Sequence, residues 1–161
     1  MLNNYLYFAH RFPAESTIDM MINIQNLDEL IQMALREDIG DGDHSTLACI
    51  PSDAVDNAKM VAKQKGILCG VEVGEKVFKM VDNTLSTTCL KHVVEKGDVI
   101  MLIEGHSRGI LTAERTALNF MQRLSGIATQ THYMVQMLEG TRTRLLDTRK
   151  TTPNMRLLEK Y

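Results

Sequence analysis

The segment of residues 145–153 concentrates side chains that bind small anions. Arg149 and Lys150 follow a short apolar stretch, and the hydroxyl of Thr148 directly precedes them. An arginine holds a carboxylate or phosphate through two parallel hydrogen bonds, and a lysine adds a compact charge. Thr152 is the expected cap of a following helix, whose free N–H groups also favour anions. The segment therefore predicts a small-anion site, and an exposed loop with incidental charges is the alternative.

Arg115 is a second candidate, in a helix that Thr112 is expected to cap. This places a cation in the first helical turn, where it opposes the helix dipole by about 0.3–1 kcal/mol. No acidic residue stands at position 119 to pair with this charge, so the placement suggests that Arg115 binds an anionic ligand. The simpler alternative is an ordinary solvated arginine beside Glu114.

Metal binding is a weak alternative for the acidic turn at residues 37–44. Its carboxylates lack the downstream Glu that completes a calcium loop, and a turn rich in Asp and Gly accounts for them without metal. His92, His106 and His132 lack paired spacing for a metal. Three cysteines are too few and too far apart for a zinc set, and their odd number argues against a closed disulfide framework. We therefore expect no metal site in this chain, and reduced thiols.

The composition excludes several classes of protein. The 161 residues carry a net charge of −2 and no lysine-rich run, so a broad face for nucleic acid is not expected. No apolar run reaches bilayer length, so no membrane association is expected. Residues 1–26 lack the apolar block of a signal peptide and are expected to form a loose extension. These features predict a cytoplasmic globular protein that binds small anions through a few placed cations.

The elements that must position these cations are predicted from apolar periodicity and turn residues. Residues 27–38 predict a helix with one apolar face, followed by a turn. The middle of the chain predicts strands at 58–64, 67–69, 85–94 and 99–103, an extension of the sheet at 108–111, and a short helix at 73–81. A long helix is expected at about 112–139, with Gly140 as its stop. A strand at 143–147 and a helix capped by Thr152 follow it.

The order of these elements predicts an α/β protein with two unequal parts. Residues 27–140 predict an α+β sandwich domain that includes the long linking helix. Residues 141–161 predict the first βα unit of a truncated TIM-like α/β barrel, because a lone βα unit cannot bury its strand on both faces. The last helix reaches Tyr161 without a stop signal. We therefore expect the natural protein to continue, or this chain to be a split or truncated product.

Five stretches resemble the quinolinate phosphoribosyltransferase family in order and register. They are ALREDIGDGD at 34–43, GILCG at 66–70, LTAERTALNF at 111–120, QRLSGIAT at 122–129 and LDTRKTTP at 146–153. The resemblance covers about residues 27–161, and its last three stretches are highly specific together. The chain before Leu27 takes no part in it.

The resemblance implies a pentosyltransferase of de novo NAD synthesis, which makes nicotinate mononucleotide, carbon dioxide and pyrophosphate from quinolinate and phosphoribosyl pyrophosphate. It implies a homodimer with shared active sites, and a sandwich domain followed by an incomplete barrel. Mg²⁺ accompanies phosphoribosyl pyrophosphate in such enzymes, with its ligands expected beyond this chain. Carried over residue by residue, Arg115 reaches the site of the partner subunit, and Arg149 and Lys150 contact quinolinate. Thr148 lines the same pocket.

The family's later motifs, which hold most of the phosphoribosyl site, are absent from this sequence, so we expect the chain to be inactive alone. Other functions remain open. The chain is alternatively a non-catalytic dimerisation or anion-binding fragment, or the paralogous pyrophosphorylase associated with molybdenum transport. A carrier domain for biotin or lipoate is indicated only by the hairpin at residues 96–100, which lacks the attachment lysine.

Overall fold

The computed structural model describes residues 27–160, so the loose extension expected at residues 1–26 lies outside the described part. The helices are α3 (Leu27–Ile39), α4 (His44–Cys49), α5 (Val71–Val81), α6 (Ser107–Met137) and α7 (Arg156–Glu159). The strands are β1 (Val55–Val61), β2 (Gly66–Ile67), β3 (Ser86–Cys89), β4 (Val93–Val94) and β5 (Val99–His106). Within this range, no helix is both long and apolar enough to cross a membrane.

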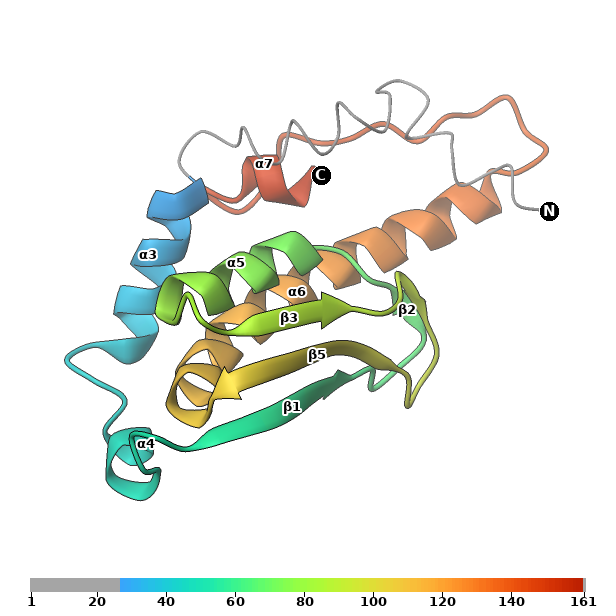
Figure 1. Cartoon of the computed structure of the whole chain (residues 1–161). Coiled ribbons are helices and arrows are strands. Elements are labelled where there is room, and N and C mark those ends of the chain that lie inside the picture. Colours follow the sequence, from blue (N-terminus) through green and yellow to red (C-terminus); the bar gives the residue numbers. More distant parts are fainter. Residues whose placement is uncertain (1–26, 161) are drawn as a thin grey trace.

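The larger sheet has three antiparallel strands in the order β1-β5-β3. Side chains alternate along the central strand β5: Met101 and Ile103 are buried, whereas Leu102 and Glu104 are exposed. Because every second side chain of this stretch is buried, one face of the sheet packs toward α5 and α6, as Figure 1 shows. The short strands β2 and β4 pair with each other in a separate sheet. The core therefore lies between the larger sheet and these two helices.

The helices α5 and α6 approach closely because two glycines leave room for side chains of α6. A Cβ on Gly74 would lie 2.6 Å from Sδ of Met121, and a Cβ on Gly70 would lie 2.5 Å from Cδ1 of Leu124. Gly70 also has a φ of 78°, in the left-handed region that disfavours residues with a Cβ. Glycine at both positions therefore lets Met121 and Leu124 pack against α5 without shifting.

Two hydroxyls on α6 complete the hydrogen bonding of the segment that contains β2. The backbone N of Ile67 donates to Oγ1 of Thr129 at 2.9 Å, and this hydroxyl donates to the carbonyl oxygen of Ile67 at 3.4 Å. One helical turn earlier, Oγ of Ser125 accepts from the backbone N of Cys69 at 3.0 Å and donates to its carbonyl oxygen at 3.2 Å. These two side chains therefore satisfy the backbone N–H and carbonyl groups that a neighbouring strand would otherwise bind.

The long helix begins earlier than the sequence pattern predicts. It starts at Ser107, so residues 108–111 are helical and do not extend the sheet, and Thr112 lies inside the helix. Strand β5 leads directly into α6 through His106, whose backbone is still extended. Ile110 is already buried on the inner face of the helix, which explains why the helix forms before Thr112. The prediction that Thr112 is the N-cap is therefore wrong.

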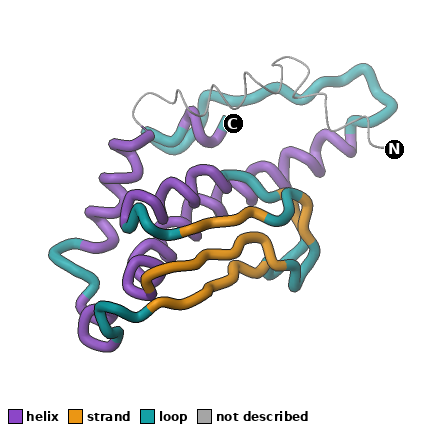
Figure 2. Tube along the Cα trace, in the orientation of Figure 1, coloured by secondary structure: helices purple, strands orange, loops and turns teal. Residues whose placement is uncertain are grey.

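The segment between α6 and α7 contains no strand. Residues 143–147 are irregular, and α7 begins at Arg156 with Met155 as its N-cap, so the predictions of a strand and of a cap at Thr152 are wrong. Backbone groups in a strand need a paired neighbour, and no described strand pairs with this segment. Figure 2 shows it as a long loop that leaves the end of α6 and returns to α7.

Candidate anion-binding site

Arg115 lies on the exposed side of α6, well inside the helix. Its Nη1 donates to Oδ1 of Asp38 at 3.1 Å, and this ion pair joins α6 to the end of α3. The side chain of Arg115 is 74% exposed, whereas that of Asp38 is 20% exposed. The predicted conflict with the helix dipole is wrong, because Arg115 is outside the first turn and has a carboxylate partner. Its solvent-facing side stays open to a further ligand.

The acidic turn between α3 and α4 is fastened to the same part of α6. Asp43 caps α4, since its Oδ1 accepts from the backbone N of Thr46 at 3.2 Å, and its Oδ2 accepts from the hydroxyl of Thr112 at 3.3 Å. Hydrogen bonds from Thr46, then from Thr112, and the charge of Arg115 outweigh burial and lower the pKa of Asp43. Between residues 27 and 160, no three His, Cys, Asp or Glu side chains gather as metal ligands. Asp43 therefore serves both as a helix cap and as an anchor to α6.

Thr148, Arg149 and Lys150 lie in an exposed loop of residues 148–151, called here the basic loop. The backbone N of Lys150 donates to Oγ1 of Thr148 at 3.0 Å, which folds the loop locally. Neither Arg149 nor Lys150 forms an ion pair with another described residue. The expected position at the end of a strand is wrong, because the preceding residues are irregular. Both cations nevertheless face solvent, where a small anion has access.

Arg123 is a basic residue beside the candidate site that the sequence did not single out. Its Nε donates to Oε1 of Glu159 at 2.8 Å, and its Nη2 contacts both Glu159 and the hydroxyl of Thr152. It follows Arg115 by about two helical turns, which is the sequence feature that points to it. Arg123 therefore connects α6 to the residues that border the basic loop.

A hollow of about 420 Å³ lies between α3, α6 and the segment before α7. Arg115, Arg123 and Thr152 are among the residues that line it, whereas the cations of the basic loop are not. One chain therefore brings Arg115 near the end of the basic loop, but it does not gather all the predicted cations in one cleft.

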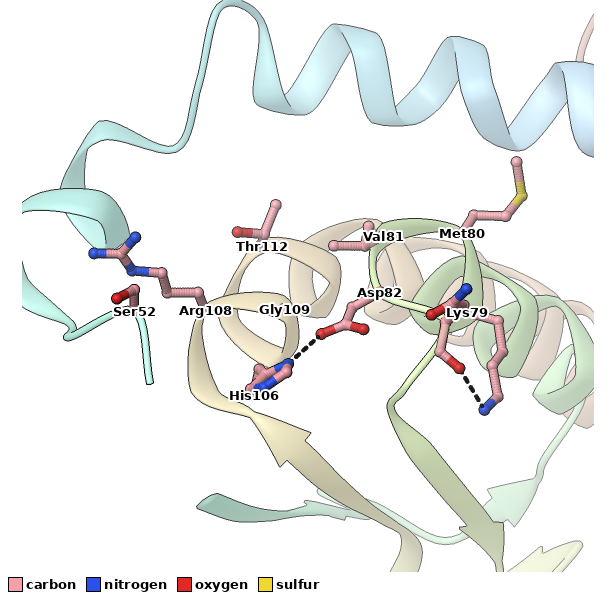
Figure 3. A pocket seen from close by; sticks show the side chains of 10 residues that line it. Ser52, Lys79, Met80, Val81, Asp82, His106, Arg108, Gly109 and Thr112 are labelled. Atoms are coloured by element: carbon pink, nitrogen blue, oxygen red, sulfur yellow. Dashed lines mark hydrogen bonds and ion pairs between the residues drawn. The ribbon is translucent and has the colours of Figure 1, made fainter. Parts of the chain in front are cut away.

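A second hollow, of about 680 Å³, lies near the junction of β5 and α6 and contains none of the predicted site residues (Figure 3). Its basic side chains already have partners within the fold. Lys79 donates to backbone carbonyl oxygens after α5, and Nε of Arg108 donates to the carbonyl oxygen of Ile50 at 2.9 Å. Nδ1 of His106 lies 3.0 Å from Oδ2 of Asp82. These groups form hydrogen bonds at the ends of helices and loops, so the candidate site remains the basic loop.

An α+β sandwich whose long helix leads into a basic loop defines a two-part α/β fold. Comparison with known families identifies which one. Residues 43–125 match the quinolinate phosphoribosyl transferase N-terminal domain, and residues 127–161 match the C-terminal domain of the same family. The chain belongs to the quinolinate phosphoribosyltransferase family, as its sequence stretches predict.

Solved structures have the same fold. NadC from Streptococcus pyogenes is 40% identical with a TM-score of 0.80, over 84% of this chain and 50% of that chain. The nicotinate-nucleotide pyrophosphorylase from Francisella tularensis is 37% identical with a TM-score of 0.80, over 86% of this chain and 51% of that chain. These matches confirm the predicted sandwich domain followed by the start of a barrel.

Named relatives in other organisms also align with most of this chain. The chloroplastic, carboxylating nicotinate-nucleotide pyrophosphorylase of Oryza sativa subsp. japonica is 40% identical, over 92% of this chain and 39% of its own length. The decarboxylating quinolinate phosphoribosyltransferase 1b of Nicotiana tabacum is 39% identical, over 96% of this chain and 43% of its own length. The chain therefore spans about half the length of the proteins it matches, or somewhat less.

Proposed function

We propose that this chain forms the quinolinate-binding part of a quinolinate phosphoribosyltransferase. The whole protein joins quinolinate to phosphoribosyl pyrophosphate and releases nicotinate mononucleotide, carbon dioxide and pyrophosphate. The observation that carries the proposal is the basic loop, where Arg149 and Lys150 are exposed and form no ion pair with a described residue. Two adjacent free cations suit a ligand that carries two carboxylates.

The proposed reaction depends on positioning and electrostatics. The ring nitrogen of quinolinate forms a bond to C1 of the ribose as the bond from C1 to pyrophosphate breaks, and pyrophosphate keeps that electron pair. The alkylated ring is positively charged, so it accepts the electron pair of the carbon–carbon bond when carbon dioxide leaves, and a proton then replaces the carboxylate. Arg149 and Lys150 hold the two carboxylates, and Thr148 contributes a hydroxyl, so that the nitrogen faces the ribose.

We propose that the active protein is a homodimer in which the partner's Arg115 completes the site. Within one chain, Arg115 lines a hollow that the cations of the basic loop do not share. A second copy is therefore the natural source of the third cation. The exposed guanidinium, held at Nη1 by Asp38, suits contact with a ligand across a subunit interface.

The proposal also covers the metal and the location of the protein. Mg²⁺ enters with phosphoribosyl pyrophosphate, and the described residues do not fit a metal site of their own, so we assign them no ligand. The proposed location is the cytoplasm, with which the free thiols of Cys49, Cys69 and Cys89 are compatible.

Isothermal titration of quinolinate into the 161-residue chain tests the proposal. The expected result is saturable binding of quinolinate, and binding of nicotinate that is weaker by about tenfold or more because nicotinate has one carboxylate. Equal binding of both acids, or binding of neither, contradicts the proposal. An assay for nicotinate mononucleotide after phosphoribosyl pyrophosphate and Mg²⁺ are added separates a transferase from an anion-binding fragment without catalysis.

A further inference from the structure

Helix α7 is held against α6 by an ion pair whose carboxylate is largely shielded from water. Nε of Arg123 donates to Oε1 of Glu159 at 2.8 Å, and the side chain of Glu159 is only 8% exposed. Leu158 beside it belongs to the core, so α7 is fixed by burial as well as by charge. Burial raises the pKa of Glu159, but hydrogen bonds from Arg123 and Thr152 outweigh this effect and lower it. The carboxylate is therefore charged and engaged at neutral pH.

The same ion pair holds the C-terminal border of the basic loop. The backbone N of Thr152, the residue after the loop, donates to Oε2 of Glu159 at 3.0 Å. Arg123 contacts the hydroxyl of the same threonine. One oxygen of Glu159 thus binds the arginine of α6, and the other binds the backbone at the end of the basic loop.

The N-terminal border of the basic loop is attached to the end of α7 as well. Nζ of Lys160 lies 2.5 Å from Oδ2 of Asp147, the residue that precedes the loop. Nε of Arg156 donates to Oγ1 of Thr151 at 3.3 Å. The consecutive residues Glu159 and Lys160 therefore fix both borders of the loop, while the cations between the borders stay exposed.

We propose that Arg123 and Glu159 are positioning residues, whose ion pair fixes the backbone from which Arg149 and Lys150 reach an anionic ligand. The inference rests on the proposed function, because the ligand is taken to be quinolinate. Nε and Nη2 of Arg123 already bind the carboxylate of Glu159, so the role proposed for Arg123 is to hold the loop and not to contact the ligand. A loop that is ordered in advance loses less conformational freedom on binding. Removing the pair therefore weakens binding without removing a cation from the site.

Two variants of the ion pair and one control test this inference in the full 161-residue chain. Glu159→Gln removes the negative charge, and Arg123→Lys keeps a positive charge but loses the planar guanidinium. Thr129→Val is the control, because it also removes a side-chain hydrogen bond of α6, but one that binds β2. Quinolinate affinity is measured by isothermal titration. The order of the amides of Arg149 and Lys150 is measured without ligand by the ¹⁵N heteronuclear NOE.

The expected result is that both variants of the pair weaken quinolinate binding on the order of tenfold, the scale on which partners that orient metal ligands act. The NOE of the basic-loop amides falls in the same variants, and Thr129→Val changes neither quantity. Arg123→Lys decides the outcome if Glu159→Gln does not fold. Unchanged quinolinate affinity in the folded variants overturns the inference. If the wild-type chain binds no quinolinate, the proposed function fails, and an unchanged NOE then separately refutes the ordering role of the pair.

Discussion

Oδ1 of Asp38 accepts a hydrogen bond from Nη1 of Arg115 at 3.1 Å, beside the hollow between α3 and α6. Asp38 is the less exposed partner, so it fixes one side of the guanidinium while the other side faces solvent. An arginine held in this way loses less rotational freedom when a second anion reaches it. The relationship explains how a highly exposed arginine is already oriented before a ligand binds.

Arg115→Ala should weaken quinolinate binding by about 1–3 kcal/mol, the scale of a lost charge-assisted contact. The same change should lower the free energy of unfolding by less than about 1 kcal/mol, because the ion pair is mostly exposed on the arginine side. Isothermal titration and urea denaturation measure the two quantities. Asp38→Asn keeps the cation and should weaken binding less; an equal loss in both variants would argue against a contact between Arg115 and ligand.

Ser125→Ala should lower the free energy of unfolding by about 1–3 kcal/mol, because the backbone N of Cys69 loses its acceptor in a half-buried position. Urea denaturation measures the loss. Ser86→Ala, at an exposed position of β3, is the control and should stay within about 0.5 kcal/mol of the wild type. Equal stability of the two variants would mean that water replaces the hydroxyl at the backbone of Cys69.

Gly70→Ala and Gly140→Ala separate backbone strain from packing. The two glycines have φ values of 78° and 80°, so a Cβ at either position should cost about 1–2 kcal/mol in backbone strain. Only at Gly70 does a Cβ also meet Leu124, which should add about 1–3 kcal/mol of overpacking. Thermal or urea unfolding should therefore show a clearly larger loss for Gly70→Ala. Similar losses would show that the contact between α5 and α6 relaxes around the methyl group.

Asp82 should make the stability of the fold depend on acid pH. Hydrogen bonds from Thr84, and then from His106, lower the pKa of Asp82 below its ordinary value of 3.8. A carboxyl whose pKa is lower in the folded state stabilises the fold above the ordinary value, and that stabilisation disappears as the pH falls through the folded pKa. The difference in unfolding free energy between the wild type and Asp82→Asn should be larger at pH 6 than at pH 2.5. A constant difference would contradict the assigned shift.

Apolar periodicity predicted the helices α3 and α5 closely, because each buries a clear stripe that includes Ile31 in α3 and Val77 in α5. It placed the start of α6 too late, because no capping side chain marks the junction at His106. The strand expected at 143–147 is absent for another reason: a strand needs a paired neighbour, and a local pattern does not show whether one exists.

The site could be predicted only in part. Residue types pointed to Arg149 and Lys150, which are adjacent in sequence, as candidate ligands of a small anion, and the family resemblance supplied the substrate; their role stays a prediction. The partners that orient the other cations are distant in sequence: Asp38 lies 77 residues from Arg115, and Glu159 lies 36 residues from Arg123. Tertiary packing brings these pairs together, so no local pattern indicates them.

The proposed function requires above all that Arg149 hold a carboxylate of quinolinate. Its direct test is the titration of quinolinate into the wild-type chain, Arg149→Ala and Arg36→Ala, where Arg36 is an exposed arginine on α3 that supplies an equal change in net charge. The predicted result is that Arg149→Ala weakens binding by about 1–3 kcal/mol while Arg36→Ala binds as the wild type does. Equal dissociation constants for the two variants would contradict the claim.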